Sequence, residues 1–168
     1  MNTYSTFYQS RIKHLWSVSD GWLGRSYQVT DGTYSYGKLS YSGFLDPIVQ
    51  IDTAAATWFI RKRGLSFMDV MNAEGRLIGT IERKWFTNKT IFTGADGFIA
   101  FYHKVSFWRS AYVWVKPDYQ VLLSCESSVF NRTESFNYSD LAYEQPYLLL
   151  LTFLALELNL RRRRGAAA

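Results

Sequence analysis

The feature that most restricts the fold of this chain is a leucine-rich run near its C-terminus, at residues 146–160. Its composition predicts a helix, because Pro146 suits a first helical turn, arginines follow the run and Gly165 comes just beyond them. From Tyr147 to Leu156 the run is apolar on every side. Such a helix requires apolar surroundings in all directions, which means either a protein core or lipid.

Length favours the protein core. A helix over residues 146–160 spans roughly 22 Å at about 1.5 Å per residue. The hydrocarbon layer of a bilayer is about 30 Å thick and requires about 20 apolar residues, and Glu157 shortens the apolar stretch further. We therefore expect a core helix. The alternative is a short tail anchor with Arg161 to Arg164 as its flanking charges.

The rest of the chain consists of short runs of β-branched and aromatic residues separated by glycine, aspartate and asparagine. Aromatic residues make up 18% of the sequence, which favours strands over a helical bundle. Asp31-Gly32 and Pro117-Asp118 are typical of turns between strands. Strands are predicted at residues 26–30, 33–41, 47–52, 55–63, 67–72, 77–85, 90–93, 98–104, 111–116 and 119–125, with weaker candidates at 129–132 and 134–138 and one or two more within 7–18.

These elements predict an all-β fold with one core helix: a closed antiparallel barrel of about twelve strands around a central hydrophobic C-terminal helix. A barrel of about eight strands has room only for its own side chains, whereas about eleven or twelve strands can enclose a helix. A single domain is expected over residues 1–160, with its helix at 146–160, followed by a basic C-terminal tail at 161–168.

Charge and cysteine content set only broad limits on location and partners. The net charge is +5, and four of the positive charges belong to Arg161 to Arg164, so the remaining sequence is close to balanced. The single Cys125 cannot form an internal disulfide, and the first residues lack the apolar segment of a secretory signal. We therefore expect a cytoplasmic protein, with peripheral membrane association left open.

The order of these features resembles the tubby C-terminal-like superfamily, which includes LURP-one-related proteins and phospholipid scramblases. The resemblance covers nearly the whole chain and is carried by Tyr27-Gln-Val-Thr-Asp-Gly32, Gly37-Lys-Leu-Ser-Tyr41, Trp58-Phe-Ile-Arg-Lys-Arg63, Phe67-Met-Asp-Val70, Glu74-Gly75, Ile78-Gly-Thr-Ile81, Asp96-Gly97, Tyr112-Val-Trp114 and the final hydrophobic helix. It implies a twelve-stranded barrel, no established enzymatic activity, and binding of phosphoinositide head groups through basic side chains on neighbouring strands. The cysteine cluster and acidic calcium loop of scramblase-like proteins are not found in the sequence.

A group of cations near the ends of successive predicted strands is the main candidate for a ligand site. If the strands pair, several of these side chains converge on one rim and can hold a phosphate through charge-assisted hydrogen bonds. The group comprises Arg61, Lys62, Arg63, Arg83, Lys84 and Lys89. The alternative is that they are ordinary solubilising charges at strand edges and turns. For Arg161 to Arg164, capping of the helix and solvation of the barrel mouth are favoured over membrane binding.

Catalytic chemistry has little support in the sequence, and no catalytic, metal or cofactor site is predicted. His14 and His103 are not spaced as metal ligands, the acidic residues are dispersed, and no nucleophile motif occurs. The aromatic residues at the predicted wall are expected to fill the space between wall and helix rather than to stack on bases or sugars. These are Trp58, Trp85, Phe107, Trp108, Tyr112 and Trp114.

The functional hypothesis is a non-enzymatic cytoplasmic barrel module that binds anionic phospholipid head groups, of the phosphoinositide type, at a basic rim. An anionic membrane surface or a phosphorylated ligand is the expected partner. Nucleic acid is not favoured, because the arginine run is short and lacks interleaved aromatic residues. The alternatives are a small hydrolase or phosphate-ester enzyme with an assembled site, and a structural or partner-binding domain.

Overall fold

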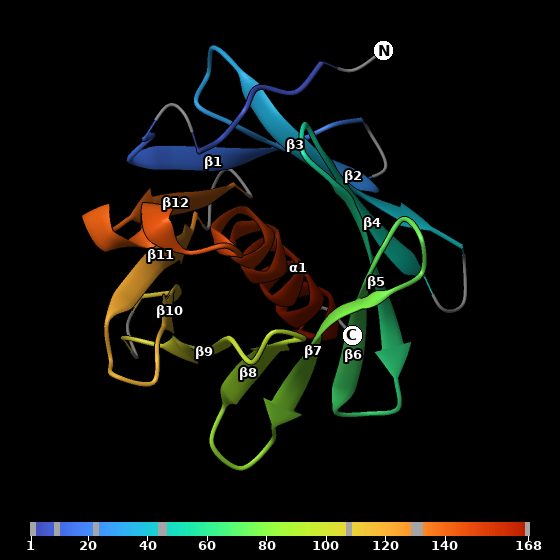
Figure 1. Ribbon diagram of the computed structural model, residues 1–168, viewed down its shortest axis with the longest axis vertical. Coiled ribbons are helices and arrows are strands. Elements are labelled where there is room, and N and C mark those ends of the chain that lie inside the picture. Colours follow the sequence, from blue (N-terminus) through green and yellow to red (C-terminus); the bar gives the residue numbers. More distant parts are fainter. Residues whose placement is uncertain are drawn as a thin grey trace.

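The computed structural model describes residues 3–8, 11–21, 24–43, 47–106, 109–128 and 133–166. Over these residues the chain forms a barrel in which consecutive strands pair antiparallel and the first strand pairs with the last, so the sheet is closed (Figure 1). The strands are β1 (His14–Ser19), β2 (Ser26–Thr30), β3 (Ser35–Ser42), β4 (Ile48–Thr53), β5 (Thr57–Arg63), β6 (Phe67–Asn72), β7 (Leu77–Lys84), β8 (Lys89–Gly94), β9 (Ile99–Lys104), β10 (Ala111–Val115), β11 (Val121–Ser127) and β12 (Glu134–Tyr138).

This architecture confirms the predicted fold class. Strands β2, β6 and β12 have the predicted bounds, β12 being one of the weaker candidates, and most of the others differ from prediction by a few residues at their ends. The N-terminal segment supplies β1, which closes the barrel against β12. The weak strand candidate at residues 129–132 lies outside the described residues.

The C-terminal helix α1 (Leu148–Ala166) follows a short 3₁₀ helix, η1 (Asp140–Glu144), and lies inside the ring of strands (Figure 1). Every residue from Leu148 to Leu160 is buried. Alternate positions of the strands face α1, for example Leu39, Ile51, Ile60 and Ile81, all fully buried. The helix that is apolar on every side therefore has an apolar wall around it. Among the described residues, no helix is both long and apolar enough to cross a membrane.

The helix differs from its predicted bounds at both ends. It begins at Leu148 and continues through the arginine run to Ala166, so the region assigned to a tail at 161–168 is helical as far as Ala166. Arginine is a good helix former, and positive charge is favourable at a helix C-terminus. Arg161 also forms an ion pair with Glu157 one turn earlier. These interactions extend the helix past the point where its apolar character ends.

The two ends of the barrel are distinguished by the direction of α1. At the end where α1 begins, Tyr147 packs against Phe92 and Phe98, beside the β8–β9 turn. Because the strands alternate in direction, the β5–β6 and β7–β8 turns lie at the opposite end, where Arg161 to Arg164 emerge. We call this opposite end the barrel mouth.

Buried polar groups near the mouth fix the position of α1. The Asn159 amide accepts a hydrogen bond from the Tyr102 hydroxyl (3.0 Å) and donates one to the Glu134 carboxylate of β12 (2.9 Å). Ser127 donates to the same carboxylate oxygen (2.6 Å), and the other oxygen lies 2.7 Å from a guanidinium nitrogen of Arg163. Glu134 and Asn159 are almost completely buried, so rotation or sliding of the helix would leave them without partners.

A second buried carboxylate, Glu157, accepts a hydrogen bond from the Tyr41 hydroxyl of β3 and pairs with Arg161. Burial and the neighbouring carboxylate raise the pKa of the Tyr41 hydroxyl, which therefore remains a donor. The two glutamates thus connect α1 to the wall at β12 and at β3, and they pair with Arg163 and Arg161 near the mouth.

Gly37→Ala tests how closely the wall approaches the helix. A Cβ at Gly37 would lie 2.6 Å from the Asp52 carbonyl oxygen and 2.8 Å from the Phe153 ring of α1. We expect a loss of about 1–3 kcal/mol in the free energy of unfolding, measured by urea denaturation. Gly165→Ala is the control, because a Cβ at that position would have nothing within 4 Å, and it should be neutral or stabilising by up to about 1 kcal/mol. Equal stability of the two variants would contradict the close packing.

Arg163→Ala tests the buried carboxylate network. Loss of the arginine leaves the Glu134 carboxylate without its cation, and a cost of about 1–3 kcal/mol is expected because part of the arginine side chain is exposed to water. Arg164→Ala is the control, since Arg164 is exposed and lies over the Tyr41 ring; its loss should cost less, about 0.5–1 kcal/mol. An equal cost for both variants would refute the assigned role of Arg163.

Reactivity of Cys125 gives an independent readout of the same network. Burial and the nearby Glu134 carboxylate raise the pKa of its thiol. Iodoacetamide should therefore alkylate Cys125 in denaturant but not in the native protein, and faster in native Arg163→Ala than in native Arg164→Ala. Rapid alkylation of the native wild type would show that this part of the core is open.

Candidate functional site

Strand alternation divides the predicted basic group between two faces of the barrel wall. Lys62 follows the buried Ile60 by two residues on β5, and Arg83 follows the buried Ile81 by two residues on β7. Their cross-strand neighbours, Met68 and Thr90, are also buried. Lys62 and Arg83 therefore continue the inward face of the wall into the barrel mouth.

The other four predicted site residues, Arg61, Arg63, Lys84 and Lys89, belong to the outer face. Arg63 forms an ion pair with Asp69 (3.0 Å), and Lys84 forms one with Glu82 (2.5 Å). Lys84 and Lys89 are opposite each other across β7 and β8. The structure thus places these four residues on the outside of the wall, apart from Lys62 and Arg83, and the predicted group of six does not form one site.

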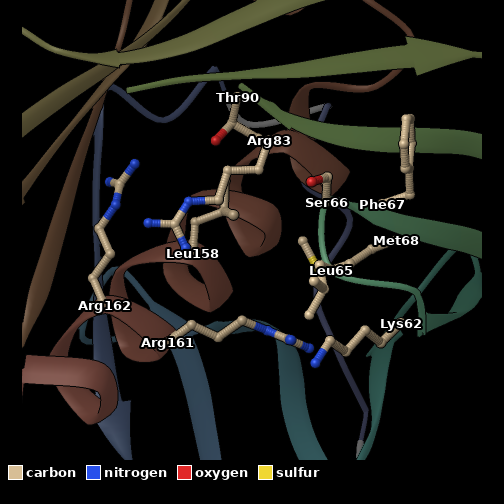
Figure 2. Close-up of a pocket in the computed structure, with 10 residues that line it drawn as sticks. All are labelled: Lys62, Leu65, Ser66, Phe67, Met68, Arg83, Thr90, Leu158, Arg161 and Arg162. Carbon is tan, nitrogen blue, oxygen red and sulfur yellow. The ribbon is translucent and has the colours of Figure 1, made fainter. Parts of the chain in front are cut away.

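Two arginines of α1 join Lys62 and Arg83 around a pocket at the barrel mouth, which we call the mouth pocket. Its complete lining is Lys62, Leu65, Ser66, Phe67, Met68, Arg83, Thr90, Leu158, Arg161 and Arg162. In Figure 2, Arg161 and Lys62 extend toward each other along one side, while the head of Arg83 points toward Arg162 across the other. The pocket therefore gathers four cationic side chains from β5, β7 and α1.

The mouth pocket has an excess of positive charge, because its lining includes no carboxylate. Arg161 pairs with the buried Glu157, one turn earlier in α1. Within the described part of the chain, Lys62, Arg83 and Arg162 have no carboxylate at ion-pair distance. A concave surface lined by one sign of charge over an apolar floor concentrates counter-ions, so this geometry favours an anion.

Aromatic rings hold two of these guanidinium groups without neutralising them. The Arg83 guanidinium lies 4.5 Å from the Trp85 ring centroid, and that of Arg162 lies 4.1 Å from the Tyr112 ring centroid. Arg162 also donates a hydrogen bond to the Asn159 amide oxygen (3.3 Å). Because a ring face supplies only a quadrupole, these contacts orient the guanidinium while leaving its charge available for an anionic ligand.

Two further hollows adjoin the mouth pocket, and Arg162 lines all three. One of them adds Lys104 and Asn88 beside Arg83 and Tyr112. The other is lined by Arg163, Asn159, Tyr112 and two serine hydroxyls, Ser110 and Ser127. The cationic surface therefore extends around part of the rim, with Arg162 at its centre.

The sequence interpretation missed Arg161 and Arg162 as pocket residues because it ended the helix at residue 160. Lys104 was also missed. Two signals in the sequence could have identified them: arginine favours continuation of the helix, and Lys104 follows the buried Tyr102 by two residues, as Lys62 follows Ile60.

The predicted aromatic residues have mixed outcomes. Trp114 is fully buried, and Trp58 and Tyr112 pack against the core, as expected for residues between wall and helix. The prediction that Trp85 fills the space between wall and helix is wrong. Trp85 is 55% exposed, because it lies in the β7–β8 turn beyond the end of the wall. Phe107 and Trp108 lie outside the described residues.

Chemically, the mouth pocket offers cations and the hydroxyls of Ser66 and Thr90, but its lining includes neither imidazole nor carboxylate to act as a general base. Among the described residues, no group of three or more histidine, cysteine, aspartate or glutamate side chains is arranged to hold a metal ion. The arrangement is suited to holding an anion by charge-assisted hydrogen bonds.

No family model, curated protein or solved structure matches this chain. The resemblance to the tubby C-terminal-like superfamily therefore remains a prediction based on the order of features in the sequence. The fold itself is established by the barrel and its central helix.

Proposed function

We propose that this protein is a non-enzymatic cytoplasmic barrel module that binds the phosphate-bearing head group of an anionic phospholipid at the barrel mouth. The observation that carries the proposal is the convergence of Lys62, Arg83, Arg161 and Arg162 on a pocket whose lining has no carboxylate. Three of these cations have no carboxylate partner within the described part of the chain. Close placement of like charges is unfavourable in the free protein and becomes favourable when an anion is bound.

The residue types fit a phosphate group. Arginine presents several N–H donors in a planar arrangement that can contact two phosphate oxygens at once, and lysine adds a compact charge. Leu158 and Met68 give the pocket an apolar floor, which strengthens electrostatic interactions above it. One adjoining hollow, lined by Lys104 beside Arg83 and Arg162, extends the cationic surface, so a head group with more than one phosphate would meet further positive charge there.

The filled barrel axis supports binding at the rim. Because α1 occupies the interior and is buried from Leu148 to Leu160, a ligand meets the protein at its rim and outer wall. The mouth pocket lies where α1 leaves the barrel, so a ligand held by Arg162 and Arg83 would contact helix and wall together.

Charge reversal on the two faces of the same two strands tests this proposal. Lys62→Glu/Arg83→Glu changes the mouth pocket, whereas Arg61→Glu/Lys84→Glu makes the same change in net charge on the outer wall of β5 and β7. Each surface cation contributes about 1 kcal/mol against anionic lipid, so loss of the two cations alone should weaken binding by about 2 kcal/mol, which is more than tenfold, and the two new carboxylates should weaken it further by repulsion. Binding is measured by co-sedimentation with phosphatidylcholine vesicles that contain a phosphoinositide.

The expected result is a selective loss in Lys62→Glu/Arg83→Glu, with near wild-type binding by the outer-wall variant. Vesicles of phosphatidylcholine alone give the background, and thermal unfolding shows that both variants are folded. An equal loss in the two variants would point to net charge rather than to the pocket. No binding by the wild type would refute the proposal.

A further inference from the structure

Apolar side chains project from the two turns that border the mouth pocket. Leu65, in the β5–β6 turn, is 83% exposed, and Phe86, in the β7–β8 turn, is completely exposed. Trp85 is half-exposed and donates a hydrogen bond from its indole nitrogen to the Ser66 hydroxyl (2.7 Å), which links the two turns. Leu65, Trp85 and Phe86 thus lie on two linked turns at the edge of the barrel mouth, and we call these three residues the apolar tip.

The apolar tip is directly connected to cationic groups. Leu65 lines the mouth pocket together with Lys62 and Arg83, and the Arg83 guanidinium lies over the Trp85 ring. Lys62 and Arg83 each lie one residue before the end of their strands, and Arg161 and Arg162 of α1 line the same pocket. The barrel mouth therefore has an apolar apex with positive charge around it, a combination that fits the interface of an anionic bilayer.

The opposite end of the barrel has a different character. Its turns contain the acidic residues Asp31, Glu74, Asp96 and Asp118, and η1 adds Asp140 and Glu144. Three of these carboxylates pair with cations, Asp140 with Lys13, Glu74 with Arg76 and Asp118 with Lys116. Exposed apolar residues also occur there, among them Tyr119 and Leu141, but the cations beside them are paired with carboxylates, unlike Lys62, Arg83 and Arg162 at the mouth. This difference in charge between the two ends would orient the molecule with its mouth toward an anionic surface.

We propose that the barrel mouth docks on an anionic membrane with Leu65 and Phe86 inserted among the lipids at the interface. This inference rests on the proposed function, since the mouth pocket would hold a head group of the same bilayer. It adds the mode of docking. Transfer of exposed leucine and phenylalanine side chains out of water is favourable, and this apolar contribution to the free energy of binding would not be screened by high salt.

Leu65→Ser/Phe86→Ser tests insertion without changing charge. Both side chains are exposed, so the fold should be retained, and the control Tyr119→Ser/Leu141→Ser removes two exposed side chains at the opposite end. With phosphatidylcholine vesicles containing phosphatidylserine, we expect at least a tenfold loss of affinity for the mouth variant and no loss for the control.

A fluorescent probe reports insertion directly. Phe86→Cys and Tyr119→Cys are each labelled with an environment-sensitive fluorophore, since Cys125 is buried. Addition of the same vesicles should raise and blue-shift the emission of the label at position 86 and leave the label at position 119 unchanged. Equal responses at both positions would contradict docking by the mouth.

The pocket and the apolar tip can fail separately. If Lys62→Glu/Arg83→Glu loses vesicle binding while Leu65→Ser/Phe86→Ser retains it and the label at position 86 stays in water, insertion is refuted and head-group binding stands. If only the serine variant loses binding, insertion stands and the pocket proposal is refuted. If the wild type binds no anionic vesicle, both are refuted, and a protein partner becomes the occupant to seek for this face.

Discussion

The structure depends on the burial of a helix that is apolar on every side. A single sheet or a neighbouring helix covers only one face of such an element, whereas from Leu148 to Leu160 every side chain of α1 requires cover. A closed barrel provides it. The dependence is mutual, because a ring of twelve strands encloses more space than its own inward side chains can fill, and α1 fills it. Neither the wall nor the helix has a complete core without the other.

This mutual dependence determines the chemistry at the mouth. The helix is longer than its apolar part, so its last turns emerge where the wall ends, and its arginines emerge with them. Glu157 and Asn159 of α1 hold the emerging end through buried partners on the wall, Tyr41 and Glu134 respectively, and Glu134 also pairs with Arg163. Arg161 and Arg163 pair with these two glutamates, while Arg162, between them in sequence, points to the hollows between helix and rim. The mouth pocket is thus a consequence of how the core is fixed.

Most of the fold could be predicted from sequence, but little of the candidate site. Hairpin turns, alternating strands and the leucine-rich run are local patterns, and together they indicate a barrel with a central helix. The site depends on non-local geometry. The alternation of side chains along β5 and β7 separates Lys62 from Arg61 and Arg83 from Lys84. That Lys62 and Arg83 lie near Arg162 depends also on the direction of α1 and on the register in which β1 pairs with β12 to close the barrel. Trp85 was misplaced because one residue decides whether an aromatic belongs to a strand or to the exposed turn after it.

In folded proteins the preference of each residue for its surroundings usually agrees with the place that the fold gives it, and departures from this agreement are concentrated at functional sites. Along the wall and the axis these preferences agree: apolar residues face inward, buried carboxylates have cations, and Asn159 has partners for both ends of its amide. At the mouth they conflict, because cations gather without a carboxylate in the pocket lining and a phenylalanine is fully exposed beside them. Both features are unfavourable for the isolated protein. A bilayer of anionic lipid would remove both together, since its head groups neutralise the cations and its interface accepts the phenylalanine, which is why one surface accounts for them more simply than two separate ligands.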